Sequence, residues 1–100
     1  MIFVNGYSAE LLSYVENFED TFKSLKNSRI LITGAAGLIG SYVTDLIITA
    51  NQKFDLNIKV IAVDLNRELL DTRFPDEFSA TVQKVYTDVN KIRLDLTDVD

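Results

Sequence analysis

The sequence has no cysteine, no histidine and no tryptophan, and its 100 residues include a single proline and four glycines. A chain without cysteine forms neither disulfides nor thiolate metal sites, which fits a reducing compartment. A chain without histidine lacks the most common metal ligand and the most common general base near neutral pH. These absences predict that the chain carries no metal site.

The sequence also lacks long apolar runs and any excess of positive charge. No apolar run approaches the roughly 20 residues that span a bilayer, and no basic region precedes an apolar one at the N-terminus. The net charge is −5 at pH 7, and no basic stripe offsets it, which argues against a nucleic-acid-binding surface. Hydrophobic residues make up 47% and charged residues 25%, as in an ordinary globular domain. The composition predicts one cytoplasmic domain that binds neither nucleic acid nor a membrane.

Three of the four glycines lie close together, as Gly34, Gly37 and Gly40. An apolar run at 30–33 precedes them, and the periodic pattern of an amphipathic helix follows over 38–50. Gly34 allows a sharp turn out of the strand through backbone angles that other residues disfavour. Gly37 has no Cβ, so a pyrophosphate can approach its backbone, and Gly40 lets the helix lie close against the strand.

The helix after this turn supplies hydrogen-bond donors. Its first N–H groups, around Leu38 and Ile39, have no partner inside the helix, and the positive end of the macrodipole lies at the same place. Strand, glycine turn and helix follow one another in the order that phosphate binding requires. The stretch is therefore predicted to bind phosphate, and a tight turn without a ligand is the alternative. Asn51 is the predicted end of this helix.

The residues before the first strand are predicted to form an amphipathic helix, with Ser8 as its N-cap. Its apolar positions follow steps of four and three residues, as one face of a helix requires. These positions are Leu11, Val15, Phe18, Phe22 and Leu25. The helix either packs on its own domain or serves a partner or a second copy. We assign 1–28 to this extension and 29–100 to the nucleotide-binding unit.

The second half of the chain is predicted to add two more strands. Residues 58–64 are β-branched and mostly apolar, as a buried parallel strand is. A short helix follows over 65–70 and ends before Pro75. The stretch 76–91 fits either a helix or a strand, and the spacing of its apolar residues favours the helix. Strand three is then expected over 91–96.

Asp64 closes the second strand, 24 residues after Gly40. A carboxylate at that strand end can accept hydrogen bonds from both hydroxyls of an adenosine ribose, and its charge repels a 2′-phosphate. Asp64 therefore favours NAD over NADP. Arg67 weakens this inference, because an arginine near the ribose can hold a 2′-phosphate. The alternative is that Asp64 is a solvated side chain at a strand end.

Residues 32–41, Ile-Thr-Gly-Ala-Ala-Gly-Leu-Ile-Gly-Ser, resemble the cofactor fingerprint of the extended short-chain dehydrogenase/reductases. More narrowly, they resemble that of the NAD-dependent epimerase/dehydratase family, which acts on nucleotide sugars. The family spaces its glycines as Gly-x-x-Gly-x-x-Gly, as this sequence does, and Asp64 matches its ribose-binding acid. Asp95-Leu96-Thr97-Asp98 is similar to the family's motif after strand three, whose first aspartate bonds the adenine amino group. The resemblance covers about residues 29–98.

Two features depart from the family pattern. The separation of 31 residues between Asp64 and Asp95 is long for this family, and Asp88 is a rival for the adenine contact. The family's catalytic Tyr-x-x-x-Lys is also absent, and in the family it lies beyond position 100. The chain therefore resembles the N-terminal part of a longer enzyme. None of the four tyrosines has a lysine four positions later: Tyr7, Tyr14, Tyr42 and Tyr86.

The resemblance implies a Rossmann-type, three-layer α/β fold, truncated here, with parallel strands in the order 3-2-1. It also implies NAD binding for hydride chemistry on a nucleotide sugar, such as epimerisation or dehydration, with no catalytic residue in this chain. A Rossmann module that senses NAD without turnover is the alternative. Strand one would lie at an open apolar sheet edge, which predicts self-association. The expected cofactor contacts are Gly34, Ala36, Gly37, Leu38, Ile39, Gly40, Asp64, Leu65, Asn66, Asp95 and Leu96.

Overall fold

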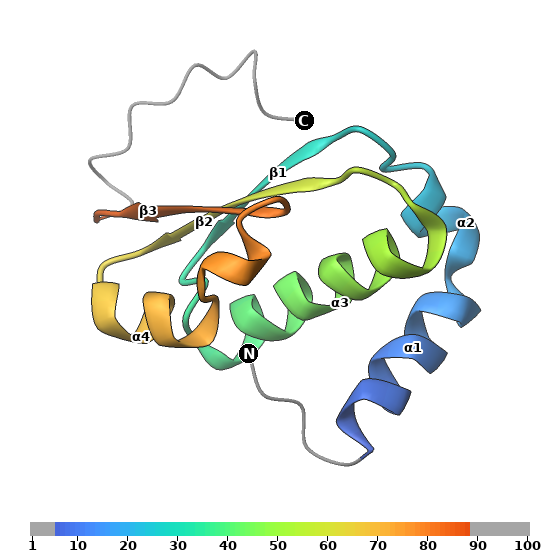
Figure 1. Cartoon of the computed structure of the whole chain (residues 1–100), viewed down its shortest axis with the longest axis horizontal. Coiled ribbons are helices and arrows are strands. Elements are labelled where there is room, and N and C mark those ends of the chain that lie inside the picture. The colour runs from blue at the N-terminus through green and yellow to red at the C-terminus, as the bar shows by residue number, and fades with distance from the viewer. Residues whose placement is uncertain (1–5, 89–100) are drawn as a thin grey trace.

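The computed structural model describes residues 6–88, which form an α/β unit around a parallel sheet (Figure 1). Three strands pair in the order β1-β2-β3, and both pairings are parallel. These observations confirm the α/β class, the parallel sheet and the edge position of strand one. The elements in chain order are α1 (Tyr7–Asn17), α2 (Glu19–Lys23), β1 (Arg29–Thr33), α3 (Leu38–Phe54), β2 (Lys59–Asp64), α4 (Arg67–Arg73), the 3-10 helix η1 (Asp76–Phe78) and β3 (Val82–Tyr86).

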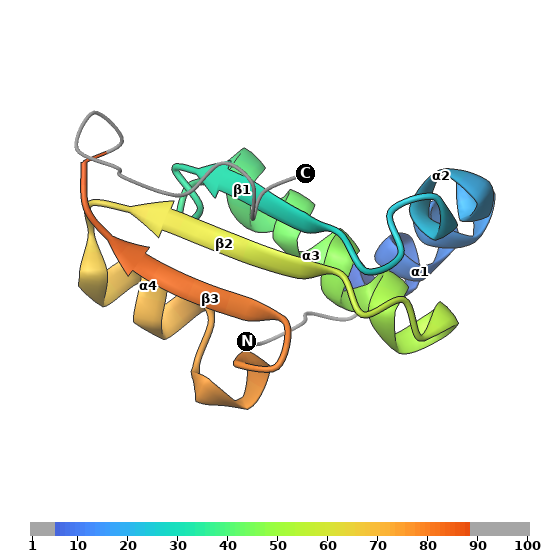
Figure 2. The same cartoon turned by 90° about the horizontal axis from the view of Figure 1, so that it is seen from above.

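The helices α3 and α4 lie on the same face of the sheet (Figure 1, Figure 2). The two crossovers, β1-α3-β2 and β2-α4-β3, advance in one direction across the sheet, and right-handed crossovers of that kind place their helices on one face. Val60 and Ala62 of β2 belong to the buried core, and the partly buried Ile32 of β1 packs against it. Residues 6–88 therefore form two layers, where the sequence predicted three.

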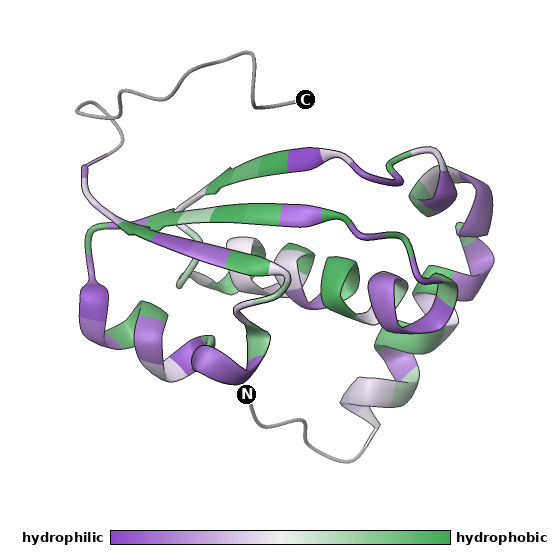
Figure 3. Cartoon of the chain, turned by 45° about the horizontal axis from the view of Figure 1, so that its top comes forward, coloured by the Kyte–Doolittle hydropathy of each residue, from purple (hydrophilic) through white to green (hydrophobic). Residues whose placement is uncertain are grey.

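Strand β2 lies at the centre of the sheet and of the core. Val60, Ile61, Ala62 and Val63 are all buried, as the apolar, β-branched sequence of this strand predicts. Figure 3 shows the hydrophobic stretches of β1 and β2 next to each other, with α3 packed beside them. Burial of each large side chain stabilises the fold by roughly 1.5–3 kcal/mol.

The side chain of Asn51 joins α3 to the segment before β2. Its Nδ2 donates to Ile58 O at 2.8 Å, and the Ile58 N–H donates to Asn51 Oδ1 at 2.9 Å. The prediction that Asn51 ends the helix is wrong, because α3 continues to Phe54. Asp55 follows in the left-handed region, with a φ of 54°, and is the C-cap. Asn51 thus connects two elements instead of terminating one.

The N-terminal segment forms two short helices where one was predicted. Phe18 lies between α1 and α2 with φ −117° and ψ 35°, outside the helical region. It is 47% exposed, so it leaves the predicted apolar face. Leu11 and Val15 are fully buried in the core that includes α3. The extension therefore packs on its own unit, as one of the two sequence alternatives states.

The start of α1 also differs from the prediction. Gly6, with a φ of 89°, is the N-cap, and no side chain caps the helix. Ser8, the predicted N-cap, lies inside α1. Gly6 takes the left-handed conformation immediately before Tyr7, so the helix begins two positions earlier than the Ser8 signal indicates.

The prediction of a helix over 76–91 is wrong. Only the short η1 follows Pro75, and the chain then enters β3, which pairs with β2 from Val60↔Val82 to Asp64↔Tyr86. Val82 is 4% exposed. The alternating apolar residues fit a strand as well as a helix, and parallel pairing with the buried β2 decides between them. The strand predicted over 91–96 lies outside the described residues.

Candidate functional site

The turn between β1 and α3 is closed by backbone hydrogen bonds. Gly34 has a φ of 62°, in the left-handed region that favours glycine. The Gly37 N–H donates to Gly34 O at 2.9 Å, and the Ala35 N–H donates to Val63 O of β2 at 3.0 Å. The predicted role of Gly34 as the residue that redirects the chain is therefore confirmed.

Gly40 lies at the closest approach between α3 and the turn. An added Cβ at Gly40 would lie 2.5 Å from Gly34 O and 3.0 Å from the Ala35 Cα. This confirms that the third glycine allows close packing, although its neighbour is the turn instead of the strand. A Cβ at Gly37 would lie 3.1 Å from Gly34 O. Gly37 therefore serves the turn itself, in addition to leaving its outer side open.

The N-terminus of α3 presents unpaired N–H groups. Gly37 is the N-cap and no side chain caps the helix, and the first bond along the helix is from Ser41 N to Gly37 O at 3.0 Å. The N–H groups of Leu38, Ile39 and Gly40 are therefore left over by helix geometry. Together with the macrodipole they form a position that attracts an anion.

The carboxylate of Asp64 is fixed by two backbone donors. Asp64 Oδ2 accepts from the Ala36 N–H at 2.9 Å, and Oδ1 accepts from the Asn66 N–H at 2.9 Å. The side chain therefore ties the glycine turn to the segment after β2, a role that the sequence analysis missed. A carboxylate has about four acceptor positions, so each oxygen can accept a further hydrogen bond.

A hollow of about 360 Å³ lies between the carboxyl ends of the three strands. Asp64 and Asp88 both line it, so the fold brings these two acidic residues to the same hollow. Asp95 and Leu96, the other expected contacts, lie outside the described residues. The full lining is Thr33, Gly34, Val63, Asp64, Leu65, Thr87 and Asp88.

A second hollow, of about 600 Å³, runs along the outer edge of β1 and the start of α3. Thr33 and Gly34 line both hollows. The turn thus stands between two concave surfaces, one over β2 and β3 and one beyond β1. Leu38 and Ile39 are 89% and 78% exposed at this second surface. An elongated ligand centred on the turn could contact both surfaces at once.

The three residues just after Asp64 make different contacts. Leu65 lines the first hollow and is 75% exposed. The Oδ1 atom of Asn66 accepts from the Leu69 N–H at 3.0 Å and caps α4. Arg67, which the sequence analysis considered as a 2′-phosphate ligand, lies over the ring of Tyr86.

Sequence reasoning missed the two threonines of the first hollow, Thr33 and Thr87. Thr33 is the last residue of the edge strand β1, and Thr87 directly follows the edge strand β3. The carboxyl ends of parallel strands meet at one edge of a sheet, and ligands bind there in open α/β sheets. That rule points to Thr33 from the sequence, but Thr87 could be placed only once β3 was known to end at Tyr86.

A second polar cluster, away from the hollows, joins three helices. Asp45 of α3 is fully buried and accepts from the Tyr7 hydroxyl of α1 at 2.6 Å. It also pairs with Arg73 of α4. Burial, followed by the bond to Asp45, raises the pKa of Tyr7 to about 12. The cluster fixes α1 and α4 to α3, and its residues Tyr7, Asp45 and Arg73 line neither hollow.

No protein-family model, curated protein or solved structure matches the chain. Among the helices of residues 6–88, none combines the length and apolar composition that a bilayer span requires. Within the same residues, no three acidic side chains are grouped as metal ligands would be. The function is therefore inferred from the turn, the strand ends and the residue pattern.

Proposed function

We propose that the chain binds NAD at the turn between β1 and α3, as the cofactor-binding part of a Rossmann-type oxidoreductase. One observation supports this most strongly. The unpaired N–H groups at the start of α3 lie next to a turn that the Asp64 carboxylate holds in place. Anion donors and a hydroxyl acceptor are thus rigidly linked, as a dinucleotide requires.

The donor set fits the chemistry of NAD. The pyrophosphate would accept from the N–H groups of Leu38 and Ile39, beside Gly37, which has no side chain. The adenosine ribose hydroxyls would donate to the acceptor positions that Asp64 retains after binding Ala36 and Asn66. When bound, the nicotinamide supplies reversible hydride transfer. The chain's own contribution is to bind and orient the dinucleotide.

Asp88 is the residue that we propose for the adenine side. It lines the first hollow together with Asp64, and it follows β3 by two residues. A carboxylate there can accept from the adenine amino group. Asp95 was the first sequence candidate for this contact, and Asp88 was its rival.

The wider role follows from the resemblance of the glycine fingerprint. We propose that the substrate of the oxidoreductase is a nucleotide sugar, whose hydroxyl is oxidised by the cofactor before epimerisation or dehydration. The sequence contains no Tyr-x-x-x-Lys, so the proton transfer that this chemistry needs is not assigned to this chain.

A charge placed at position 38 tests cofactor binding without harming the fold. Leu38 is 89% exposed and is the first residue of α3. In Leu38→Asp, the carboxylate stabilises the helix by about 0.3–1 kcal/mol through the macrodipole. The same charge repels the pyrophosphate, so the NAD affinity should fall by about tenfold or more. Calorimetric titration with NAD measures the affinity, and urea denaturation measures the stability.

The matched control is Leu38→Asn, which has the same shape without the charge. We expect it to retain the affinity of the wild type. Equal NAD affinities in the Asp and Asn variants, or no binding by the wild type, would contradict the proposal. Separate titrations with ADP-ribose and nicotinamide mononucleotide show which half of the dinucleotide binds. The adenosine half should account for most of the affinity, because Asp64 and Asp88 line the first hollow, where we propose that it binds.

A further inference from the structure

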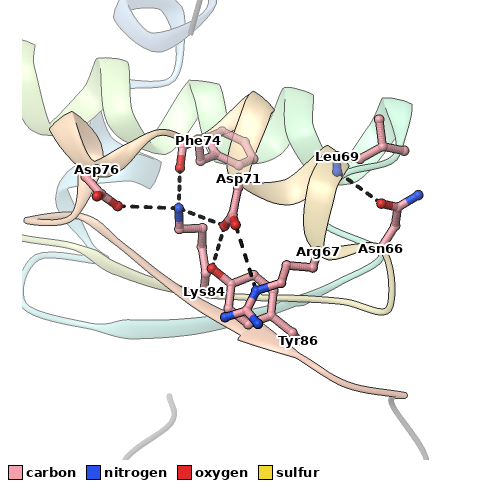
Figure 4. Close-up of polar contacts among 8 residues, drawn as sticks. All are labelled: Asn66, Arg67, Leu69, Asp71, Phe74, Asp76, Lys84 and Tyr86. Atoms are coloured by element: carbon pink, nitrogen blue, oxygen red, sulfur yellow. Dashed lines mark hydrogen bonds and ion pairs between the residues drawn. The ribbon is translucent and has the colours of Figure 1, made fainter.

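Two contacts hold the side chain of Arg67 in place (Figure 4). Its guanidinium carbon lies 4.2 Å from the centroid of the Tyr86 ring, and its Nε lies 3.9 Å from Asp71 Oδ2. The Arg67 side chain is 71% exposed, so burial does not set its position. The ring and the carboxylate do so.

Asp71 is kept in place and charged by its neighbours. The Tyr86 hydroxyl donates to Asp71 Oδ1 at 2.5 Å, and Lys84 Nζ lies 3.1 Å from the same oxygen. Lys84 in turn donates to Phe74 O at 2.9 Å. The hydrogen bond from Tyr86, followed by that from Lys84, lowers the pKa of Asp71 below its usual range. The carboxylate that faces Arg67 is therefore ionised at neutral pH.

This cluster lies next to the proposed ribose position. Tyr86 is the register partner of Asp64 across β2 and β3, and such partners lie about 5 Å apart with side chains on the same face. Asn66, the residue before Arg67, donates its N–H to Asp64 Oδ1. Arg67 therefore lies close enough to Asp64 in the sequence to contact a 2′-phosphate on the ribose. Its guanidinium, however, already contacts Tyr86 and Asp71.

We infer that Tyr86 and Asp71 determine cofactor specificity by holding Arg67. This inference rests on the proposed binding of NAD at Asp64. A 2′-phosphate could recruit Arg67 only by displacing it from the ring and the carboxylate. Exposed cation–π contacts and exposed ion pairs are each modest, so the discrimination that they add is several-fold. This discrimination favours NAD over NADP, as the repulsion of a 2′-phosphate by Asp64 does.

The experiment is a set of titrations with NAD and NADP on the 100-residue chain. Tyr86→Leu removes both the ring and the hydroxyl, and Asp71→Asn removes the charge. In each variant the ratio of the NADP to the NAD dissociation constant should fall by about three- to tenfold. The change is no larger because an exposed cation–π contact or ion pair is weak. The gain should come from tighter NADP binding, with the NAD affinity nearly unchanged.

Arg67→Ala identifies the source of the gain. In the wild-type background it should leave the ratio almost unchanged, because the guanidinium is not available to the phosphate. In the Tyr86→Leu background it should abolish the gain. Tyr14→Leu is the matched control, since Tyr14 is a comparably exposed tyrosine on α1, and it should leave the ratio unchanged.

The outcomes separate the two proposals. If the wild type binds NAD and the ratio does not change in Tyr86→Leu and Asp71→Asn, the specificity inference is wrong and the binding proposal stands. A ratio that falls equally with Arg67 present and absent also overturns the inference. If the wild type binds neither NAD nor NADP, both proposals are overturned. Circular dichroism of each variant verifies that the sheet is intact.

Discussion

The carboxylate of Asp64 accepts a hydrogen bond from the backbone N–H of Ala36, 28 residues earlier in the chain, at 2.9 Å. One side chain at the end of β2 thus holds the turn that follows β1. Its other oxygen accepts from the Asn66 N–H. Asp64 therefore fixes the turn through contacts within the chain, and its contribution to folding accompanies any contribution to binding.

Asp64→Ala should destabilise the protein as well as weaken NAD binding. The substitution leaves the N–H groups of Ala36 and Asn66 without their acceptor, which costs about 1–3 kcal/mol, toward the lower end where water reaches them. It should also narrow the preference for NAD over NADP, because the charge that repels the 2′-phosphate is lost. Urea denaturation and paired titrations measure the two effects.

Glu16→Ala is the control for Asp64→Ala. It removes a carboxylate of the same charge from an exposed position on α1, and it should change neither stability nor affinity appreciably. If Asp64→Ala unfolds at the same urea concentration as the wild type, the carboxylate does not stabilise the turn.

Gly40→Ala should destabilise the protein, against the general rule for helices. A glycine-to-alanine change inside a helix normally gains about 1 kcal/mol. Here the new Cβ would lie 2.5 Å from Gly34 O and 3.0 Å from the Ala35 Cα, both backbone atoms. Such overpacking costs about 1–3 kcal/mol, so the net effect should be a loss of stability. Thermal denaturation provides the measurement.

Gly37→Ala provides the comparison for Gly40→Ala. The Cβ at Gly37 would lie 3.1 Å from Gly34 O, and its φ of −75° is ordinary for any residue. The loss of stability should therefore be smaller than for Gly40→Ala. If Gly40→Ala raised the melting temperature, the close approach of α3 to the turn would be refuted.

The contribution of Tyr7 to stability should depend on pH. Burial and the bond to Asp45 raise the pKa of Tyr7 to about 12 in the folded protein, above the ordinary value of about 10. A raised pKa means that the folded state holds its proton more tightly than the unfolded state. The associated stability is complete below about pH 10 and is lost as the pH rises toward 12.

Comparison with Tyr7→Phe isolates this effect, because the variant has no hydroxyl to titrate. The difference in unfolding free energy between wild type and Tyr7→Phe should be constant from pH 7 to about pH 9 and should shrink above about pH 10. Urea denaturation at a series of pH values measures the difference. A difference that stays constant up to pH 11 would show that the folded protein does not raise the pKa of Tyr7.

The edge position of β1 in the sheet of residues 6–88 should make the 100-residue chain associate. β1 is an edge strand, and a hollow of about 600 Å³ with apolar residues Leu31, Ile32 and Val43 follows it. Such an edge recruits another strand. Sedimentation velocity should detect dimers or larger species as the concentration rises. A monomer at every concentration would contradict the prediction.

A charge beside the edge tests the site of association. Val43→Lys should reduce association, because lysines next to an edge disfavour pairing. Leu12→Lys is the matched control, since Leu12 and Val43 are both 37% exposed and Leu12 lies on α1. Equal sedimentation by the two variants would place the association elsewhere.

Sequence patterns alone determined much of the fold. The apolar, β-branched run at 58–64 predicted the central strand, because a parallel strand is buried on both faces. The spacing of Gly34, Gly37 and Gly40 predicted the strand-turn-helix unit, since Gly34 needs unusual backbone angles and Gly40 leaves no room for a Cβ. These signals are local, and local signals can be read from the order of the residues.

Tertiary structure alone decided what depends on distant partners. The apolar residues of 82–86 fit a helix or a strand by their spacing, and pairing with β2 made them β3. The same pairing brought Asp88 to the hollow with Asp64. Asp45 gave no signal within its helix, because its partners Tyr7 and Arg73 come from two other helices. When the conformation or role of a residue depends on contacts with distant parts of the chain, it cannot be assigned before those contacts are known.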